Sequence, residues 1–118
     1  MTTSAWKSSN EENEMIRLSQ GEAFEIEFTL KARDGTSITP SIVTEVEATC
    51  GDMTKLYSTG EIYYDGEGIW VFPLTQEETM KMSGIRPLKA RAKFSDEQVG
   101  KAELGPVVVY REKSRRKL

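Results

Sequence analysis

The chain has 118 residues, one cysteine and no histidine, and its 16 lysines and arginines are outnumbered by 19 aspartates and glutamates, for a net charge of −3 at pH 7. This length indicates a single domain whose core is large enough to fold without disulfide bonds or a structural metal ion. Because histidine is absent, the composition excludes Ser-His-Asp and Cys-His catalytic sites and zinc sites with imidazole ligands, and it disfavours an ordinary hydrolase.

Residues 1–14 are polar and acidic and contain one large apolar side chain, that of Trp6. Such a segment buries too little surface to offset the entropy cost of ordering, so we predict a flexible N-terminal arm. Alternatively, Trp6 anchors the arm on a neighbouring subunit. The segment lacks the apolar run of a signal peptide, and no stretch is apolar for long enough to span a membrane, so we expect a soluble protein made in the cytoplasm.

Short strands are predicted along the first half of the domain. Residues 24–30 alternate apolar and polar side chains, the pattern of a strand with one face in the core and one in solvent. Residues 45–50 alternate in the same way and place Cys50 on the apolar face, as a small buried side chain. Shorter strand pieces follow at 55–57 and 61–64, and a hairpin loop is predicted at 65–68.

The run 69–72 is apolar on both faces. It must therefore be covered on both sides, either as a central strand of a sandwich or by another subunit. One short helix is predicted after it, over about 75–83, because Thr75 and Glu78 have the spacing of a capping box. Gly84 can adopt the left-handed conformation that ends such a helix.

The last third of the domain continues the strand pattern. Residues 88–94 alternate, with Lys89, Arg91 and Lys93 on the polar face, and a turn leads to a strand over 99–104. Gly105–Pro106 is expected to break that strand before a final one at 107–110. About seven or eight short antiparallel strands indicate an all-β sandwich over residues 15–110.

The basic residues gather in two places. Residues 111–118 hold five basic residues and one acidic residue, a net charge of +4, which leaves −7 for residues 1–110. We interpret this basic C-terminal tail as a solvated end or an electrostatic docking segment. The polar face of 88–94 is expected to pair with glutamates such as Glu25 and Glu27, across the sheet or on another copy. The acidic body and the lack of a base-stacking motif argue against a nucleic-acid partner.

The predicted strands hold four aromatic residues that could stack on a sugar ring, as in carbohydrate-binding β-sandwiches: Tyr57, Tyr63, Tyr64 and Trp70. In short strands, such residues more often belong to the core or to an interface. The acidic loop residues do not have the spacing of a calcium-binding loop. We therefore predict neither a metal ion nor a cofactor.

The segment 70–79 (WVFPLTQEET) and the alternating segment 89–94 (KARAKF) resemble a group of small proteins from tailed phages and prophages of Gram-positive bacteria. Residues 15–24 and 31–40 are similar to the usual opening of these proteins. The same layout resembles the N-terminal module of phage baseplate upper proteins, over roughly residues 15–110. The resemblance implies an immunoglobulin-like β-sandwich without catalytic residues.

The resemblance also implies a function. It indicates a non-enzymatic structural component of a phage particle, in the tail, baseplate or neck or on the capsid surface, which assembles with itself and with other virion proteins after synthesis in the host cytoplasm. A carbohydrate-binding host-recognition module and a small phage protein that binds a host protein are the alternatives. The candidate partner-binding residues are Trp6, Tyr63, Tyr64, Lys89, Arg91, Lys93, Arg115, Arg116 and Lys117.

Overall fold

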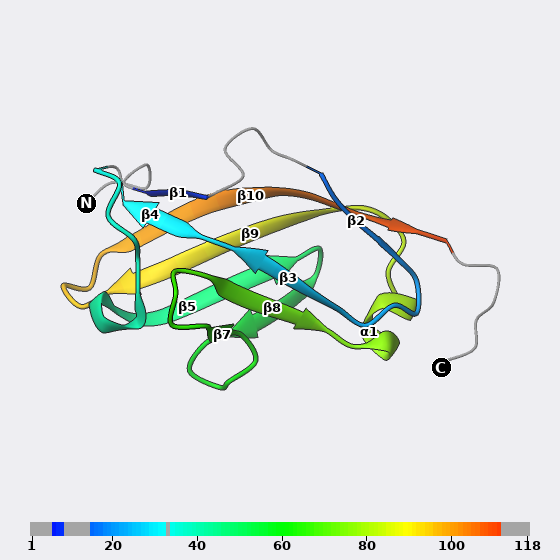
Figure 1. Cartoon of the computed structure of the whole chain (residues 1–118), viewed down its shortest axis with the longest axis horizontal. Helices are drawn as coiled ribbons and strands as arrows, with labels where there is room; N and C mark the ends of the chain where they lie inside the picture. Colours follow the sequence, from blue (N-terminus) through cyan, green and yellow to red (C-terminus); the bar gives the residue numbers. More distant parts are fainter. Residues whose placement is uncertain (1–5, 9–14, 33, 112–118) are drawn as a thin grey trace.

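The computed structural model describes residues 6–8, 15–32 and 34–111, which form ten strands and two short helices (Figure 1). The strands are β1 (Trp6–Ser8), β2 (Ile16–Ser19), β3 (Phe24–Phe28), β4 (Leu30–Ala32), β5 (Val43–Cys50), β6 (Met53–Leu56), β7 (Tyr63–Tyr64), β8 (Trp70–Leu74), β9 (Gly84–Phe94) and β10 (Val99–Tyr110). The helices are the 3-10 helix η1 (Pro40–Ile42) and the α-helix α1 (Gln76–Met80). The predicted all-β class is confirmed. No helix in the described ranges is both long and apolar enough to cross a membrane.

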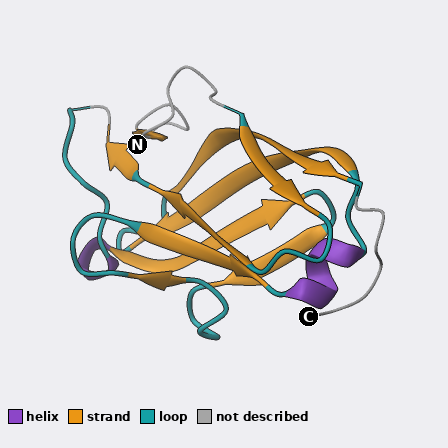
Figure 2. Cartoon of the chain, turned by 45° about the vertical axis from the view of Figure 1, so that its right-hand side comes forward, coloured by secondary structure: helices purple, strands orange, loops and turns teal. Residues whose placement is uncertain are grey.

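Two sheets form the sandwich. One has the strand order β2-β10-β9-β5-β6 and the other β3-β8-β7, while β1 and β4 form a separate pair. The two helices lie at opposite ends of the sandwich (Figure 2). Every strand pair is antiparallel except β2 and β10, which run parallel, so the expectation of antiparallel strands is wrong for this pair. No hairpin joins these two strands, and nothing in the connection therefore imposes antiparallel pairing.

The predicted alternation sets the core. From Val46 in β5 and from Leu88 in β9, every second residue is buried between the sheets, and Ile26 and Phe28 of β3 face the same interior. Thr29 differs from its expected place on the wet face, because it is half-buried and its Oγ1 is shielded from solvent. The alternation therefore predicted which side chains of β3 face the core. It did not predict the partial burial of Thr29, which directly follows β3.

Strand β8 explains the run that is apolar on both sides. It lies between β3 and β7, and both Trp70 and Val71 are buried although they face opposite sides of the sheet. The Trp70 indole Nε1 donates to the Ile38 carbonyl oxygen at 3.0 Å. The rings of Tyr57 and Tyr64 pack on Trp70 with centroid separations of 5.3 and 5.0 Å. The strand is thus a central strand of this chain, which was one of the two predicted alternatives.

Helix α1 is shorter than predicted. It has the expected capping box between Thr75 and Glu78, but it ends at Met80. Beyond it, Met82 is buried, and its carbonyl oxygen accepts a hydrogen bond of 2.7 Å from the Gln20 side chain. This anchoring draws the chain away from the helical path. Gly84 has the expected positive φ, +76°, but it begins β9 instead of ending the helix.

The predicted break at Gly105–Pro106 does not end a strand. Strand β10 continues through it with a bulge between Glu103 and Gly105, where Gly105 has a φ of +103°. Pro106 lies opposite Pro87, at a point where β10 has not yet paired with β2 and β9 has not yet paired with β5. Each proline therefore lies in a part of the ladder that has one neighbouring strand, where a missing N–H is tolerated.

Part of the predicted arm is ordered on its own chain. Residues Trp6–Ser8 form β1, which runs antiparallel to β4 and lies beside β10. The sequence did not predict this strand within the expected arm. The rest of the arm, and the basic tail beyond Arg111, lie outside the described residues.

Candidate interaction surface

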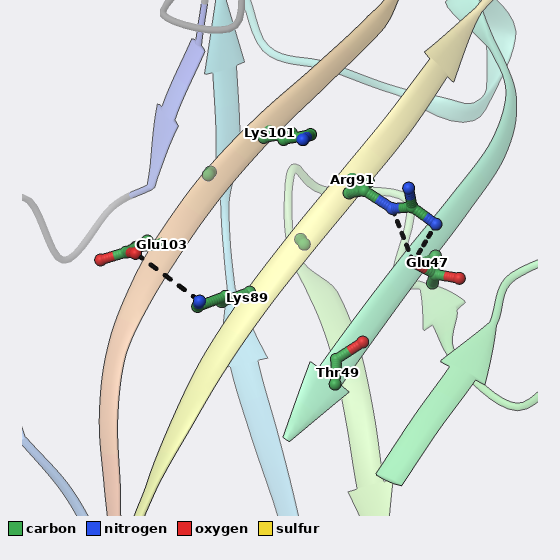
Figure 3. A pocket seen from close by; sticks show the side chains of 8 residues that line it. Glu47, Thr49, Lys89, Arg91, Lys101 and Glu103 are labelled. Atoms are coloured by element: carbon green, nitrogen blue, oxygen red, sulfur yellow. Dashed lines mark hydrogen bonds and ion pairs between the residues drawn. The ribbon is translucent and has the colours of Figure 1, made fainter. Parts of the chain in front are cut away.

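The outer face of the five-stranded sheet carries a regular array of charged side chains. Strand register places Glu47, Arg91 and Lys101 in one row across β5, β9 and β10. Thr49, Lys89 and Glu103 form the next row (Figure 3). We call these six residues, five charged side chains and Thr49, the charged ladder. They line an open hollow of about 560 Å³, whose floor includes Ala90 and Ala102.

The ion pairs of the charged ladder lie at the surface, with only Glu47 half-buried. Both Nε and Nη2 of Arg91 lie 2.7 Å from the Glu47 Oε1, and the Lys89 Nζ lies 3.9 Å from the Glu103 Oε1. Lys101 forms no ion pair with any described residue. The side chains of Lys89 and Glu103 are 57% and 78% exposed, so their pair adds little to stability. These charges remain available to a partner.

The predicted salt-bridge partners of the basic strand are wrong within one chain. Glu25 and Glu27 belong to β3, in the other sheet. Lys89 and Arg91 pair instead within the charged ladder, and the Lys93 Nζ lies 3.2 Å from the Glu97 Oε2 in the following turn. The period-2 pattern predicted which face these cations occupy, but neighbouring strands in the sheet, which that pattern does not reveal, decide their partners.

An apolar patch adjoins the charged ladder at the end of β9 and β10. It consists of Ile85, Pro87, Pro106, Val108 and Tyr110, and we call it the apolar outer patch. Ile85 is 69% exposed and Tyr110 is 49% exposed. The bulge at Gly105 creates this patch, because it allows both Leu104 and Val107 to face the core and so turns the even-numbered residues after it outward.

The sequence interpretation missed the apolar outer patch. The signal was available for β9, because counting back in steps of two from Lys89 reaches Pro87 and then Ile85 on the outer face. It was hidden for β10, where the predicted break at Gly105–Pro106 concealed the continuity of the strand.

The outer face of the three-stranded sheet is acidic and is bounded by one tyrosine. The Tyr63 hydroxyl donates to the Glu25 Oε2 at 2.6 Å, and this bond, together with the negative charges nearby, raises the pKa of the Tyr63 phenol. Register places Tyr63 and Glu27 on either side of the buried Val71. Tyr63 is thus held on the surface over an apolar strand.

The aromatic platform, which the sequence left open as an alternative to a core position for these residues, does not form among the described residues. Of its members, Tyr57 and Tyr64 pack against the fully buried Trp70, and the Tyr64 hydroxyl accepts a hydrogen bond of 2.9 Å from the Gly68 backbone N–H. Tyr63, 40% exposed, lies on the opposite face of β7 from Tyr64. Two neighbouring tyrosines of one strand point to opposite faces, so they cannot stack on the same ligand.

A buried lysine lies between the two sheets near α1. The Lys55 Nζ donates to the Pro73 carbonyl oxygen at 2.6 Å and to the Glu78 Oε1 at 3.0 Å, and it lies 5.2 Å from the Phe72 ring centroid. The same Glu78 oxygen accepts from the Thr75 backbone N–H at 2.9 Å. Every contact of this ammonium is made within the chain, which indicates a structural role.

Two other groups with possible chemistry are also accounted for. Burial raises the pKa of the Cys50 thiol to about 11, so the thiol is protonated and unreactive at neutral pH. Within the described ranges, no group of three or more metal-ligating side chains is close enough to hold an ion. The Asp65 carboxylate instead accepts backbone hydrogen bonds from Glu67 and Ile69 within its own hairpin loop.

The remaining predicted site residues are not brought together by the described structure. Trp6 lies in β1 opposite Ala32. Arg115, Arg116 and Lys117 lie outside the described residues. The residues that the fold does assemble are therefore those of the charged ladder and the apolar outer patch.

Comparison with known proteins defines the fold class. The chain is similar to a solved structure reported as "Structures of Clostridium thermocellum CbhA fibronectin(III)-like modules", with 20% sequence identity and a TM-score of 0.52 over 89% of this chain and 94% of that one. This similarity identifies a fibronectin III-like, and hence immunoglobulin-like, β-sandwich. No family model matches the sequence, and no curated protein matches it significantly.

Proposed function

We propose that the chain is a non-enzymatic structural component of a tailed phage particle, in the tail, baseplate or neck or on the capsid surface, and that it assembles through protein–protein contacts. The observation that carries this proposal is the outer face of the five-stranded sheet. There, exposed charges adjoin an apolar patch that no described segment covers. The sequence resemblance to phage and prophage proteins supplies the setting, and the β-sandwich agrees with it.

The chemistry of the chain supports a non-catalytic role. No imidazole is available as a general base, and the single thiol is buried and protonated. The hollow of the charged ladder is open and is lined by the ion pairs Arg91–Glu47 and Lys89–Glu103 and by Lys101, which has no ion-pair partner among the described residues. Such a surface suits a protein partner with complementary charges, because exposed charges chiefly set specificity and association rate.

The positions of the tyrosines do not support the carbohydrate-binding alternative. It required several tyrosines on one face, whereas Tyr57 and Tyr64 belong to the core cluster around Trp70. Tyr63 alone offers one ring, and its hydroxyl is already bonded to Glu25. We therefore retain the assembly role as the proposed function.

Quantitative mass spectrometry of purified particles tests this proposal. We expect the chain in particles of the phage or induced prophage that encodes it, and fewer copies when Arg91→Glu and Lys101→Glu reverse the charge of the ladder. Lys81→Glu is the control, because Lys81 is an exposed cation at the C-cap of α1 and does not belong to the charged ladder. Absence of the chain from particles, with capture of one stoichiometric host protein, would overturn the proposal in favour of a host-binding role.

A further inference from the structure

We propose that the chain forms a weak two-fold dimer through its apolar outer patch, with the axis running between β9 and β10 and parallel to them. The inference rests on the proposed assembly function and names the partner of that face as a second copy. A two-fold axis in this position exchanges β9 and β10. Each β9 residue therefore faces, on the second copy, the residue that is its own cross-strand neighbour.

The shape of the patch favours this arrangement. Register pairs Ile85 with Val108 and Pro87 with Pro106, so in the dimer each of these residues meets the apolar partner of its pair from the second copy. Ile85 has the largest exposed fraction, 69%, among the large apolar side chains of the described residues. Beside it, an open hollow of about 430 Å³ includes Pro87, Gly105 and Pro106 in its lining and gives room for side chains of a second copy.

The charges at the edge of the patch complement themselves. Lys89 lies opposite Glu103 in the register, and within one chain their charged atoms approach only to 3.9 Å. In the dimer, Lys89 faces Glu103 of the second copy, and Glu103 faces Lys89 of the second copy. The next row pairs Arg91 with Lys101, two cations, so the contact ends at the Lys89–Glu103 row.

The size of the patch sets the expected affinity. It comprises a few side chains on two strands, well short of the roughly 1,600 Å² of a standard interface. We therefore expect a dimer that dissociates on dilution within the micromolar range or above. In a particle with many copies, such weak contacts would add through avidity.

Sedimentation equilibrium of the full chain over a range of concentrations tests the dimer. Ile85→Asp should weaken dimerisation at least tenfold while leaving the thermal midpoint nearly unchanged, because Ile85 is exposed. Val99→Asp is the matched control. Val99 is also β-branched, lies on the same outer face and is 42% exposed, but it belongs to the far end of β10. A wild-type chain that stays monomeric, or a dimer that Ile85→Asp leaves intact, would overturn the proposal.

Charge exchange between copies tests the axis. Lys89→Glu and Glu103→Lys should each weaken self-association, because like charges then face each other across the axis. An equal mixture of the two variants should dimerise again, since every residue 89 then faces a residue 103 of opposite charge on the second copy. Failure of the mixture to recover would overturn the two-fold arrangement.

The two proposals can fail separately. A monomeric chain that is still found in purified particles would overturn the dimer and leave the structural function in place. A dimer that is absent from particles would overturn the structural function and leave the dimer.

Discussion

Phe28 and its neighbours show how strictly the strand period divides the two faces of β3. Phe28 is 2% exposed, whereas Glu27 faces solvent. Phe28→Ala should lower the free energy of unfolding by about 3–5 kcal/mol, because it leaves a cavity between the sheets. Glu27→Ala should change it by less than about 0.5 kcal/mol. Urea denaturation of both variants measures the difference, and equal effects would mean that the register of β3 is wrong.

Thr29 is half-buried and Thr79 is fully buried, but only the Thr79 hydroxyl has a hydrogen-bond partner among the described residues. The Thr29 Oγ1 is shielded from solvent and has no hydrogen-bond partner among the described residues, whereas the Thr79 Oγ1 donates to the Glu22 carbonyl oxygen at 2.9 Å. Thr29→Val should keep or raise the free energy of unfolding, by up to about 1 kcal/mol, because it removes an unpaired hydroxyl. Thr79→Val should lower it by about 1–2 kcal/mol. The same denaturation measurement compares them, and a matching loss in both would contradict the assignment for Thr29.

At the scale of the element, Glu78 joins the cap of α1 to the buried Lys55. Burial raises the pKa of the Glu78 carboxyl, but hydrogen bonds from Thr75 and from Lys55 outweigh burial and hold it below the ordinary 4.5. Folding thus favours the ionised form. The ionised Glu78 carboxylate therefore stabilises the folded state fully above pH 4.5. This contribution is lost as the pH falls through the lower pKa that Glu78 has in the folded state.

Unfolding measured as a function of pH tests this contribution. Glu78→Gln should flatten the loss of stability below pH 4.5, because glutamine can still accept the capping hydrogen bond but cannot take up a proton. A part of the slope should remain: burial raises the pKa of Glu45, but hydrogen bonds from Ser58 outweigh it, so that pKa is also lowered. An unaltered slope in Glu78→Gln would contradict the role of the Lys55–Glu78 pair.

The bulge of β10 depends on one glycine. Gly105 has a φ of +103°, a conformation that side chains with a Cβ rarely adopt. Gly105→Ala should therefore lower the free energy of unfolding by about 1–3 kcal/mol. It should also disturb amide chemical shifts from Leu104 to Val107, where the phase of the strand changes. Lys101→Ala, which is exposed on β10 before the bulge, should change neither. A neutral Gly105→Ala would mean that the bulge carries no strain.

Across the whole molecule, local sequence patterns predicted which faces of the strands are buried, but not which strands pair with each other. The period of two predicted the core faces of β3, β5 and β9, and the spacing of Thr75 and Glu78 predicted the cap of α1, because both signals act within a few residues. The helix length, the parallel β2–β10 pair and the continuity of β10 depend on residues distant in the chain. The charged ladder was predicted in part, since its cations follow the strand period while their partners come from other strands.

The pairing of β2 with β10 also has a consequence for the order in which the strands fold during synthesis. Ile16 lies opposite Val107, and the described residues give β2 no other strand partner. A growing chain therefore cannot seat β2 in the five-stranded sheet until β10 has left the ribosome. A product truncated before β10 would expose the edge of β9 and would lack three of the five residues of the apolar outer patch, so the surface proposed for assembly exists only on chains that have been translated through β10.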